Sequence, residues 1–170
     1  MSNKPTQADL DVIENQLGRT PRDVQAISFR CPCGNPAVVA TPPRLSDGTP
    51  FPTFYYATCP KLTGAISTLE TTGMMAEMQD RLGTDKNLAS TYVNAHEQYQ
   101  AARNELGMHV PEVEGITAGG MPDRVKCLHS LVAHSLSAGP GVNPLGDEAL
   151  AALPKWWLTD SCEVKQEENK

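Results

Sequence analysis

The sequence predicts an α+β domain in which a small antiparallel sheet packs against four to five helices. Between residues 24 and 59, short β-branched and aromatic runs alternate with turns rich in proline and glycine, a pattern typical of about three short strands. On both sides of this segment, apolar residues recur at helical spacing. Because the chain has 170 residues, we expect one domain over residues 1–160 and a polar, disordered tail at 161–170.

The first predicted helix has a start signal and a stop signal. Thr6 can cap its N-terminus, and Asp9 follows three residues later, which is the spacing of a capping box. Gly18 can end the helix, because glycine readily adopts the left-handed conformation that follows many last turns. Between these signals, apolar side chains recur on one face at Leu10, Ile13 and Leu17.

Three strands are predicted in the segment that follows. The strand-like runs are VQAISF, PAVVAT and PTFYYAT, and the turns between them are CPCGNP and PPRLSDGTPF. Seven prolines from Pro32 to Pro60 keep these strands short and favour sheet edges, because proline cannot donate a backbone hydrogen bond. We therefore expect a small antiparallel sheet.

Two helices are predicted directly after the sheet. The first runs from about residue 62 to residue 83, and Gly73 can interrupt it. The second spans about 87–106 and has an apolar stripe at helical spacing, with Leu88, Tyr92, Ala95, Tyr99, Ala102 and Leu106. We expect this stripe to be buried.

Two more helices are predicted toward the end of the chain. One is expected at about 122–138, because Pro122 suits the first position of a helix. The other is short, is capped by Asn143 and ends near Leu153. We expect the helices at 87–106 and 122–138 to pack against the sheet.

Charge and hydropathy exclude several function classes. The 20 acidic and 14 basic residues give a net charge of −6, and so acidic a surface does not attract nucleic acid or anionic membranes. No stretch approaches the roughly 20 apolar residues of a membrane span, and the acidic, amphipathic start does not resemble a signal peptide. We therefore expect a cytoplasmic protein with reduced cysteines, no nucleic-acid partner and no membrane insertion.

Cysteines and a histidine form the first candidate site, with zinc as the candidate cofactor. Soft thiolates and imidazoles that are gathered by turns suit a tetrahedral zinc ion. We expect the sulfurs of Cys31, Cys59 and Cys127 to lie close together. Cys33 or His129 is then the fourth ligand. In the alternative interpretation, these cysteines are buried as small hydrophobic side chains.

The start of the last long helix decides whether Cys127 and His129 can share an ion. Inside an ideal helix they lie about 200° apart, so they can bind one ion only if the helix starts after them. His134 is about 20° from Cys127 in azimuth but about 10 Å away along the helix axis. Cys162 belongs to the polar tail, and we expect it to take no part.

A second candidate site is predicted to bind an anion such as a phosphate or a carboxylate. Gly119 and Gly120 precede the predicted helix start at Pro122, and Arg124 and Lys126 fall in its first turns. A helix N-terminus offers unpaired N–H groups and the positive end of the helix dipole. The glycines leave room for a ligand to approach the backbone.

The loop at 42–52 bears on the same anion site. Arg44 can complete the pocket if this loop folds over the same helix end. In the alternative interpretation, Arg124 forms a structural ion pair with Asp47, Asp123 or Asp147, which holds the loops together.

Two histidines are further candidates. His96 lies at the margin of the apolar stripe, where it suits either a general base beside a pocket or a structural histidine held by a hydrogen bond. His134 lies on the helix predicted at 122–138.

Three long phrases of the sequence resemble a known family. They are RCPCGNPAVVATPPRLSDGTPFPTFYYATCP, NAHEQYQAAR and AGGMPDRVKCLHSLVAHSLSAGPGVNPLGDEAL. In these phrases the chain is similar to DUF501, an uncharacterised bacterial family found mainly in actinobacteria, and the resemblance covers about residues 8–153. It implies a small cytosolic protein. The septum-formation gene that neighbours such genes also implies a protein partner in cell-division or envelope machinery.

The sequence leaves three functions open. We favour a ligand- or metal-binding pocket formed by the loops at 42–52, 118–129 and 139–147, because loops rich in polar residues commonly carry function. One alternative is an adaptor of cell-division or envelope machinery without catalytic activity. The other is an enzyme that acts on a phosphorylated small molecule.

Overall fold

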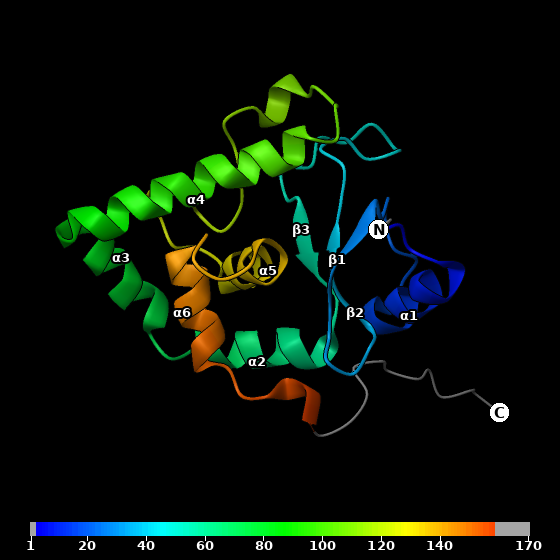
Figure 1. Ribbon diagram of the computed structural model, residues 1–170, viewed down its shortest axis with the longest axis horizontal. Coiled ribbons are helices and arrows are strands. Elements are labelled where there is room, and N and C mark those ends of the chain that lie inside the picture. Colours follow the sequence, from blue (N-terminus) through cyan, green and yellow to red (C-terminus); the bar gives the residue numbers. More distant parts are fainter. Residues whose placement is uncertain (1–2, 159–170) are drawn as a thin grey trace.

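Along the chain, one helix precedes a small sheet and a series of helices follows it (Figure 1). The computed structural model describes residues 3–158. Its helices are α1 (Gln7–Leu17), α2 (Pro60–Glu70), α3 (Met74–Thr84), α4 (Lys86–Asn104), α5 (Leu128–Ala138) and α6 (Pro144–Ala152). Its strands are β1 (Ala26–Arg30), β2 (Pro36–Ala40) and β3 (Tyr55–Ala57), and short 3-10 turns lie at Pro111–Val113 and Trp156–Leu158. The α+β prediction is confirmed, whereas the predicted tail at 161–170 and Cys162 lie outside the described residues.

The sheet is antiparallel, with the strand order β1-β2-β3. All five residues of β2 are buried, because the central strand is covered on both faces. On one face, Ile27 and Val39 pack with Ile13 of α1. On the other face, Val38 and Ala40 join the main core, where α5 contacts all three strands. The sheet is therefore a layer between α1 and α5.

α1 begins and ends where the sequence predicts. Thr6 and Asp9 form both hydrogen bonds of a capping box, and Gly18 is left-handed with φ of 69°. Two polar contacts then hold the helix on the sheet. Arg30 of β1 forms a two-pronged ion pair with Asp9 at 2.8 and 2.9 Å, and Gln16 donates to the Pro36 carbonyl at 2.8 Å. The Arg30 guanidinium holds the pKa of Asp9 well below its usual range.

α5 occupies the centre of the molecule. Six of its eleven residues are apolar, and Leu128, Leu131 and Val132 are fully buried. Figure 1 shows α5 almost end-on, surrounded by α4, α6, α2 and the sheet. α6 approaches most closely at Gly146, where a Cβ atom would collide with the Leu131 carbonyl. The prediction of a helix that packs against the sheet is confirmed for this part of the chain.

α4 carries the predicted apolar stripe. Tyr92, Ala95 and Tyr99 have no exposed surface, as expected. The tyrosine hydroxyls also anchor two loops. Tyr92 donates to the Arg124 carbonyl at 2.7 Å, and Tyr99 accepts from the Phe54 N–H at 2.6 Å. α4 therefore fixes the chain on both sides of α5.

The predicted helix start at Pro122 is wrong, because α5 begins at Leu128. Residues 119–123 form a turn, and residues 124–127 continue from it as an irregular segment that leads to α5. Here the Arg124 N–H donates to the Gly120 carbonyl, and the Lys126 N–H donates to the Gly119 carbonyl, both at 2.8 Å. These bonds, together with the Tyr92 contact to the Arg124 carbonyl, replace the first turns of the expected helix.

His134 of α5 is a buried histidine whose Nδ1 accepts a hydrogen bond. The Asn143 amide donates to His134 Nδ1 at 3.1 Å, and the ring stacks on Tyr55 with centroids 5.8 Å apart. Burial lowers the pKa of His134 to about 4. The ring is therefore neutral at pH 7, and it serves the core rather than a site.

We expect His134 to make the fold sensitive to acid. As the pH falls from about 6.5 to about 4, the unfolded chain gains a proton at this histidine and the folded chain does not. The free energy of unfolding should therefore fall, by about 3 kcal/mol in total from this group. Urea unfolding at a series of pH values measures this loss. His134→Gln should remove this part of the pH dependence and His109→Gln, in an exposed loop, should keep it; equal pH dependence in the two variants would contradict the assignment.

Candidate metal centre

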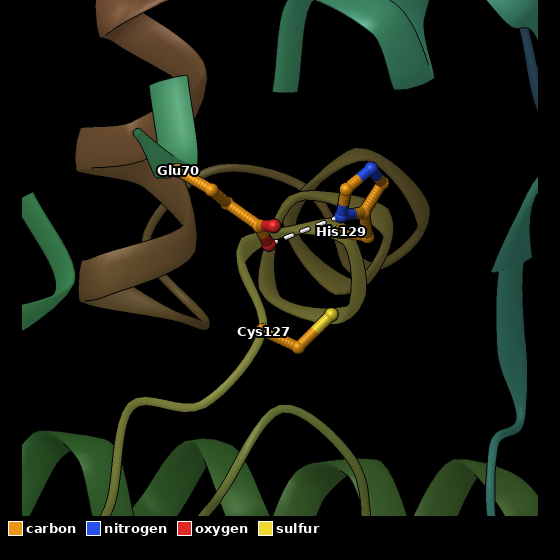
Figure 2. A group of neighbouring side chains, drawn as sticks. All are labelled: Glu70, Cys127 and His129. Atoms are coloured by element: carbon orange, nitrogen blue, oxygen red, sulfur yellow. Dashed lines mark hydrogen bonds and ion pairs between the residues drawn. The ribbon is translucent and has the colours of Figure 1, made fainter. Parts of the chain in front are cut away.

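Three potential metal ligands converge where α2 ends and α5 begins. Glu70 is the last residue of α2, Cys127 is the N-cap of α5, and His129 lies in the first turn of α5. One ligand atom from each lies within 4.8 Å of the others. Figure 2 shows the carboxylate, the thiol and the imidazole pointing toward one another. This is the one group of three such ligands among residues 3–158.

The face that α2 turns to the site follows from its sequence. Leu62 and Ile66 are fully buried and orient the helix on the core. Thr63, Ser67 and Glu70 are spaced by four and three residues, so they form an adjacent stripe along the helix. All three contact the ring of His129. The packing of α2 thus determines the surroundings of this histidine.

Hydrogen bonds fix the orientation of His129. Its Nε2 lies 3.2 Å from the Thr63 carbonyl oxygen, which can only accept, and 3.2 Å from the Ser67 hydroxyl, which can accept or donate, so a hydrogen on Nε2 suits both partners. Its Nδ1 lies 3.0 Å from Glu70 Oε1, which is also an acceptor when ionised. With the hydrogen on Nε2, a cation between Nδ1 and the ionised carboxylate completes this contact. It is either a second proton on the ring or a bound metal ion.

The position of Cys127 makes its sulfur a good ligand. Cys127 has an extended backbone, with φ of −153°, and precedes the first turn of α5. Burial raises the pKa of the Cys127 thiol, but hydrogen bonds from His129 and Ser130 outweigh it and hold the pKa below its ordinary value. The contact with Cys127, reinforced by Glu70, in turn raises the pKa of His129 to about 9 despite burial. Without a metal, the site is an imidazolium beside a thiol that ionises more readily than usual.

A cavity of about 430 Å³ lies beside the site. Cys127, His129 and Ser130 line one part of it, and Tyr55, Tyr56 and Thr63 line another. Two of the three ligands are therefore accessible to a small molecule in this cavity.

The other predicted cysteine ligands do not join Cys127. The expected group of Cys31, Cys59 and Cys127 is wrong for the described residues, where the single three-ligand group contains Glu70 instead. Cys59 precedes α2 on the face of Leu62 and lies in the apolar core, as does Cys31. It is also about 16 Å along the helix axis from Glu70. Cys31 and Cys59 thus follow the alternative interpretation, and Cys33 is exposed.

The glycines of the predicted anion site face the chain itself. A Cβ atom at Gly119 would lie 2.7 Å from the Leu131 side chain, and one at Gly120 would lie 2.6 Å from the Arg124 carbonyl oxygen. The helix N-terminus expected after them is absent, because α5 starts at Leu128. These glycines permit close packing of a turn.

The cations of the predicted anion site are exposed or paired with an acidic side chain. Arg124 and Lys126 are exposed in the irregular segment at 124–127, and Arg44 pairs with Glu112 at 2.8 Å. Within residues 3–158, Arg124 forms no ion pair with an aspartate. An anion site at these residues therefore stays a prediction, and no helix N-terminus at Pro122 supports it.

The remaining candidates have structural hydrogen bonds. His96 Nδ1 lies 2.8 Å from Thr117 Oγ1, and the Gln100 amide donates to His96 Nε2 at 2.7 Å. Burial is the main cause that lowers the pKa of His96. Asp47 accepts from the Thr49 N–H, and Asp147 accepts from the Gly141 N–H.

The three loops of the predicted pocket line different cavities. The loop at 42–52 contributes Leu45 and Phe51 to one, and Cys127 and His129 line a second. Gly139 and Asp147 line a third. Of these three loops, only the one at 118–129 contributes residues to the candidate site. The remaining ligand comes from α2.

A comparison with protein families identifies the chain. Residues 27–151 match the family model described as a protein of unknown function, DUF501. The chain belongs to the DUF501 family. The matched segment contains all three residues of the candidate metal centre and starts after α1. No curated protein and no solved structure matches this DUF501 chain.

The helices of this DUF501 chain were compared with the requirements of a membrane-spanning helix. Among residues 3–158, no helix combines the length and the apolar character that crossing a bilayer requires. The cytoplasmic location and the partner in division or envelope machinery stay predictions.

Glu70 was not among the predicted ligands, although the sequence carries a signal for it. Thr63, Ser67 and Glu70 form a polar stripe on a helix whose other face is apolar. Polar side chains beside a buried helix face can form hydrogen bonds with the element that packs against that face. Glu70 lies 59 residues from His129, so the contact itself is a product of the fold of this DUF501 chain.

We expect Cys127 to be the most reactive of the described cysteines when metal is removed. Its thiolate fraction at neutral pH depends on His129, so His129→Gln should slow alkylation of Cys127 about tenfold. Mass spectrometry after labelling with iodoacetamide in a chelator-containing buffer measures the rate at each cysteine. Ser67→Ala removes another contact of the same ring and is the matched control, with a rate close to that of the unaltered protein. Equal rates in both variants would show that His129 does not activate the thiol.

Proposed function

We propose that this chain is a metal-binding protein whose Glu70, Cys127 and His129 hold one divalent transition-metal ion. The orientation of His129 is the observation that carries the proposal. Its Nε2 is fixed on the Thr63 carbonyl, and its Nδ1 is aimed at the Glu70 carboxylate. Metal-binding histidines characteristically donate the N–H of their other nitrogen to a carbonyl or carboxylate, which sets the tautomer and the ring orientation.

The donor set favours zinc. A thiolate, an imidazole and a carboxylate are all accepted zinc ligands, and a soft sulfur ligand disfavours calcium and magnesium. The site offers three protein ligands, which is the number found at catalytic zinc ions, whereas structural zinc ions have four. The residues at this site therefore fit a zinc ion that keeps one coordination position for a water or a substrate.

The adjoining cavity indicates what that position would serve. Cys127 and His129 line it together with Tyr55 and Tyr56, so a ligand in this cavity would meet both aromatic rings and metal ligands. A zinc ion here would act as a Lewis acid on a carbonyl or phosphoryl oxygen, or would lower the pKa of a bound water. The Ser130 hydroxyl, which donates to the Cys127 sulfur at 3.8 Å, stabilises the thiolate that such a site requires.

We expect the purified protein to bind one zinc ion per chain, measured by elemental analysis after dialysis against zinc. Cys127→Ser and Glu70→Gln should each weaken zinc binding by about 100-fold or more, because loss of a ligand exceeds the 10- to 100-fold effect of losing one of its supporting hydrogen bonds. Substitution by cobalt should give a sulfur-to-cobalt absorption band in the near ultraviolet, and Cys127→Ser should abolish it.

Cys33→Ser is the matched control for this experiment. Cys33 is exposed and lies outside the three-ligand group, so its removal should leave affinity and spectrum unchanged. A protein that takes up no zinc or cobalt, or a cobalt band that persists in Cys127→Ser, would contradict the proposed centre.

A further inference from the structure

Arg103 is a buried cation near the end of α4. Only 2% of the surface of Arg103 is exposed. Two of its N–H groups donate to backbone carbonyls, at 2.8 Å to Pro52 and at 2.9 Å to Val113. Its Nε is buried and has no hydrogen-bond partner. The guanidinium is thus held firmly by two neutral acceptors, with donors still unused.

Arg103 has no acidic counter-ion within residues 3–158. The ion pairs in this part of the chain involve other cations. Burial lowers the pKa of Arg103, and the neighbour that opposes this effect is Tyr99, a neutral phenol at pH 7. Burying a charge without a partner of opposite sign is unfavourable in free energy. A bound anion beside Arg103 would offset this cost.

Arg103 lines a cavity of about 220 Å³. Gln100, Asn104 and His109 supply further polar groups to its wall, and Glu114 lies at the same cavity. A water molecule occupies about 30 Å³ in the liquid, so the space suits a small ligand rather than a single water. Here an unsatisfied buried cation and a polar cavity coincide.

We infer that this cavity binds a small oxyanion, a phosphate or carboxylate group, whose charge is paired with Arg103. A guanidinium has five N–H donors in a planar fork, and the two carbonyls use two of them. The remaining donors suit the oxygens of one anion. This site is separate from the proposed metal centre, because none of its lining residues is shared with the cavity beside Cys127.

Glu114 provides a test of the charge argument. It is exposed, lines the same cavity, and forms no ion pair with Arg103. Its negative charge opposes the entry of an anion. Removing that charge should therefore strengthen anion binding by about fivefold. This is the order of effect expected for one like charge at the wall of the same cavity in a partly polar medium.

The experiment follows the side-chain Nε–H signal of Arg103 by nuclear magnetic resonance. In the full chain, inorganic phosphate and acetate are titrated separately, so that the two arms distinguish a phosphate ligand from a carboxylate ligand. Arg103→Lys assigns the signal and should weaken binding at least about tenfold, because lysine lacks the planar fork. Glu114→Gln is compared with Asp80→Asn, which removes the same charge from an exposed position on α3.

A saturable shift of the Arg103 signal at millimolar phosphate or acetate is expected, with tighter binding in Glu114→Gln and unchanged binding in Asp80→Asn. If Arg103→Lys fails to fold, the shift and the Glu114→Gln comparison still decide the matter. No shift with either anion would overturn the inference. Equal tightening in Glu114→Gln and Asp80→Asn would also overturn it, because the effect would then be one of net charge alone.

Discussion

α5 has to bury almost its whole surface, and this requirement arranges the other elements around it. All of its residues except Ala138 are buried or half-buried, so a single sheet or a single helix cannot cover it. The sheet, α2, α4 and α6 each cover one side, and α6 comes close only because Gly146 has no side chain. Both ends of α5 therefore lie at junctions between elements. The candidate metal centre is at its N-terminal junction.

The residues before α5 show why the helix can begin so late. Leu128 would have an unpaired N–H group at the start of the helix, and Glu70 of α2 accepts from it at 2.8 Å. In the turn before the helix, Gln79 of α3 accepts from the Val125 N–H and donates to the Asp123 carbonyl. Tyr92 of α4 donates to the Arg124 carbonyl. The helix is thus capped by another element rather than by its own preceding residues. Local sequence carries no sign of such a cap.

Much of the fold could be predicted because its signals are local. The capping box of Thr6 and Asp9, the break at Gly73 and the alternation in the 24–59 segment each act within a few residues, and each element formed as expected. The site was predicted in part. Cys127 and His129 were expected at a metal centre, but Glu70 was missed and Cys59 was wrongly included, because burial on α2 decides which side chains face His129.

One oxygen atom, Oε1 of Glu70, belongs to two structures at once. It accepts the Leu128 N–H at 2.8 Å and faces His129 Nδ1 at 3.0 Å. The first turn of α5 and the ligand group therefore share one hydrogen-bond acceptor, so opening of either removes a contact of the other. An ion at the centre would lengthen the lifetime of the closed state, and the exchange of the Leu128 amide hydrogen with solvent would report that lifetime. Binding of an ion at this site would thus slow the opening of the helix at the middle of the protein.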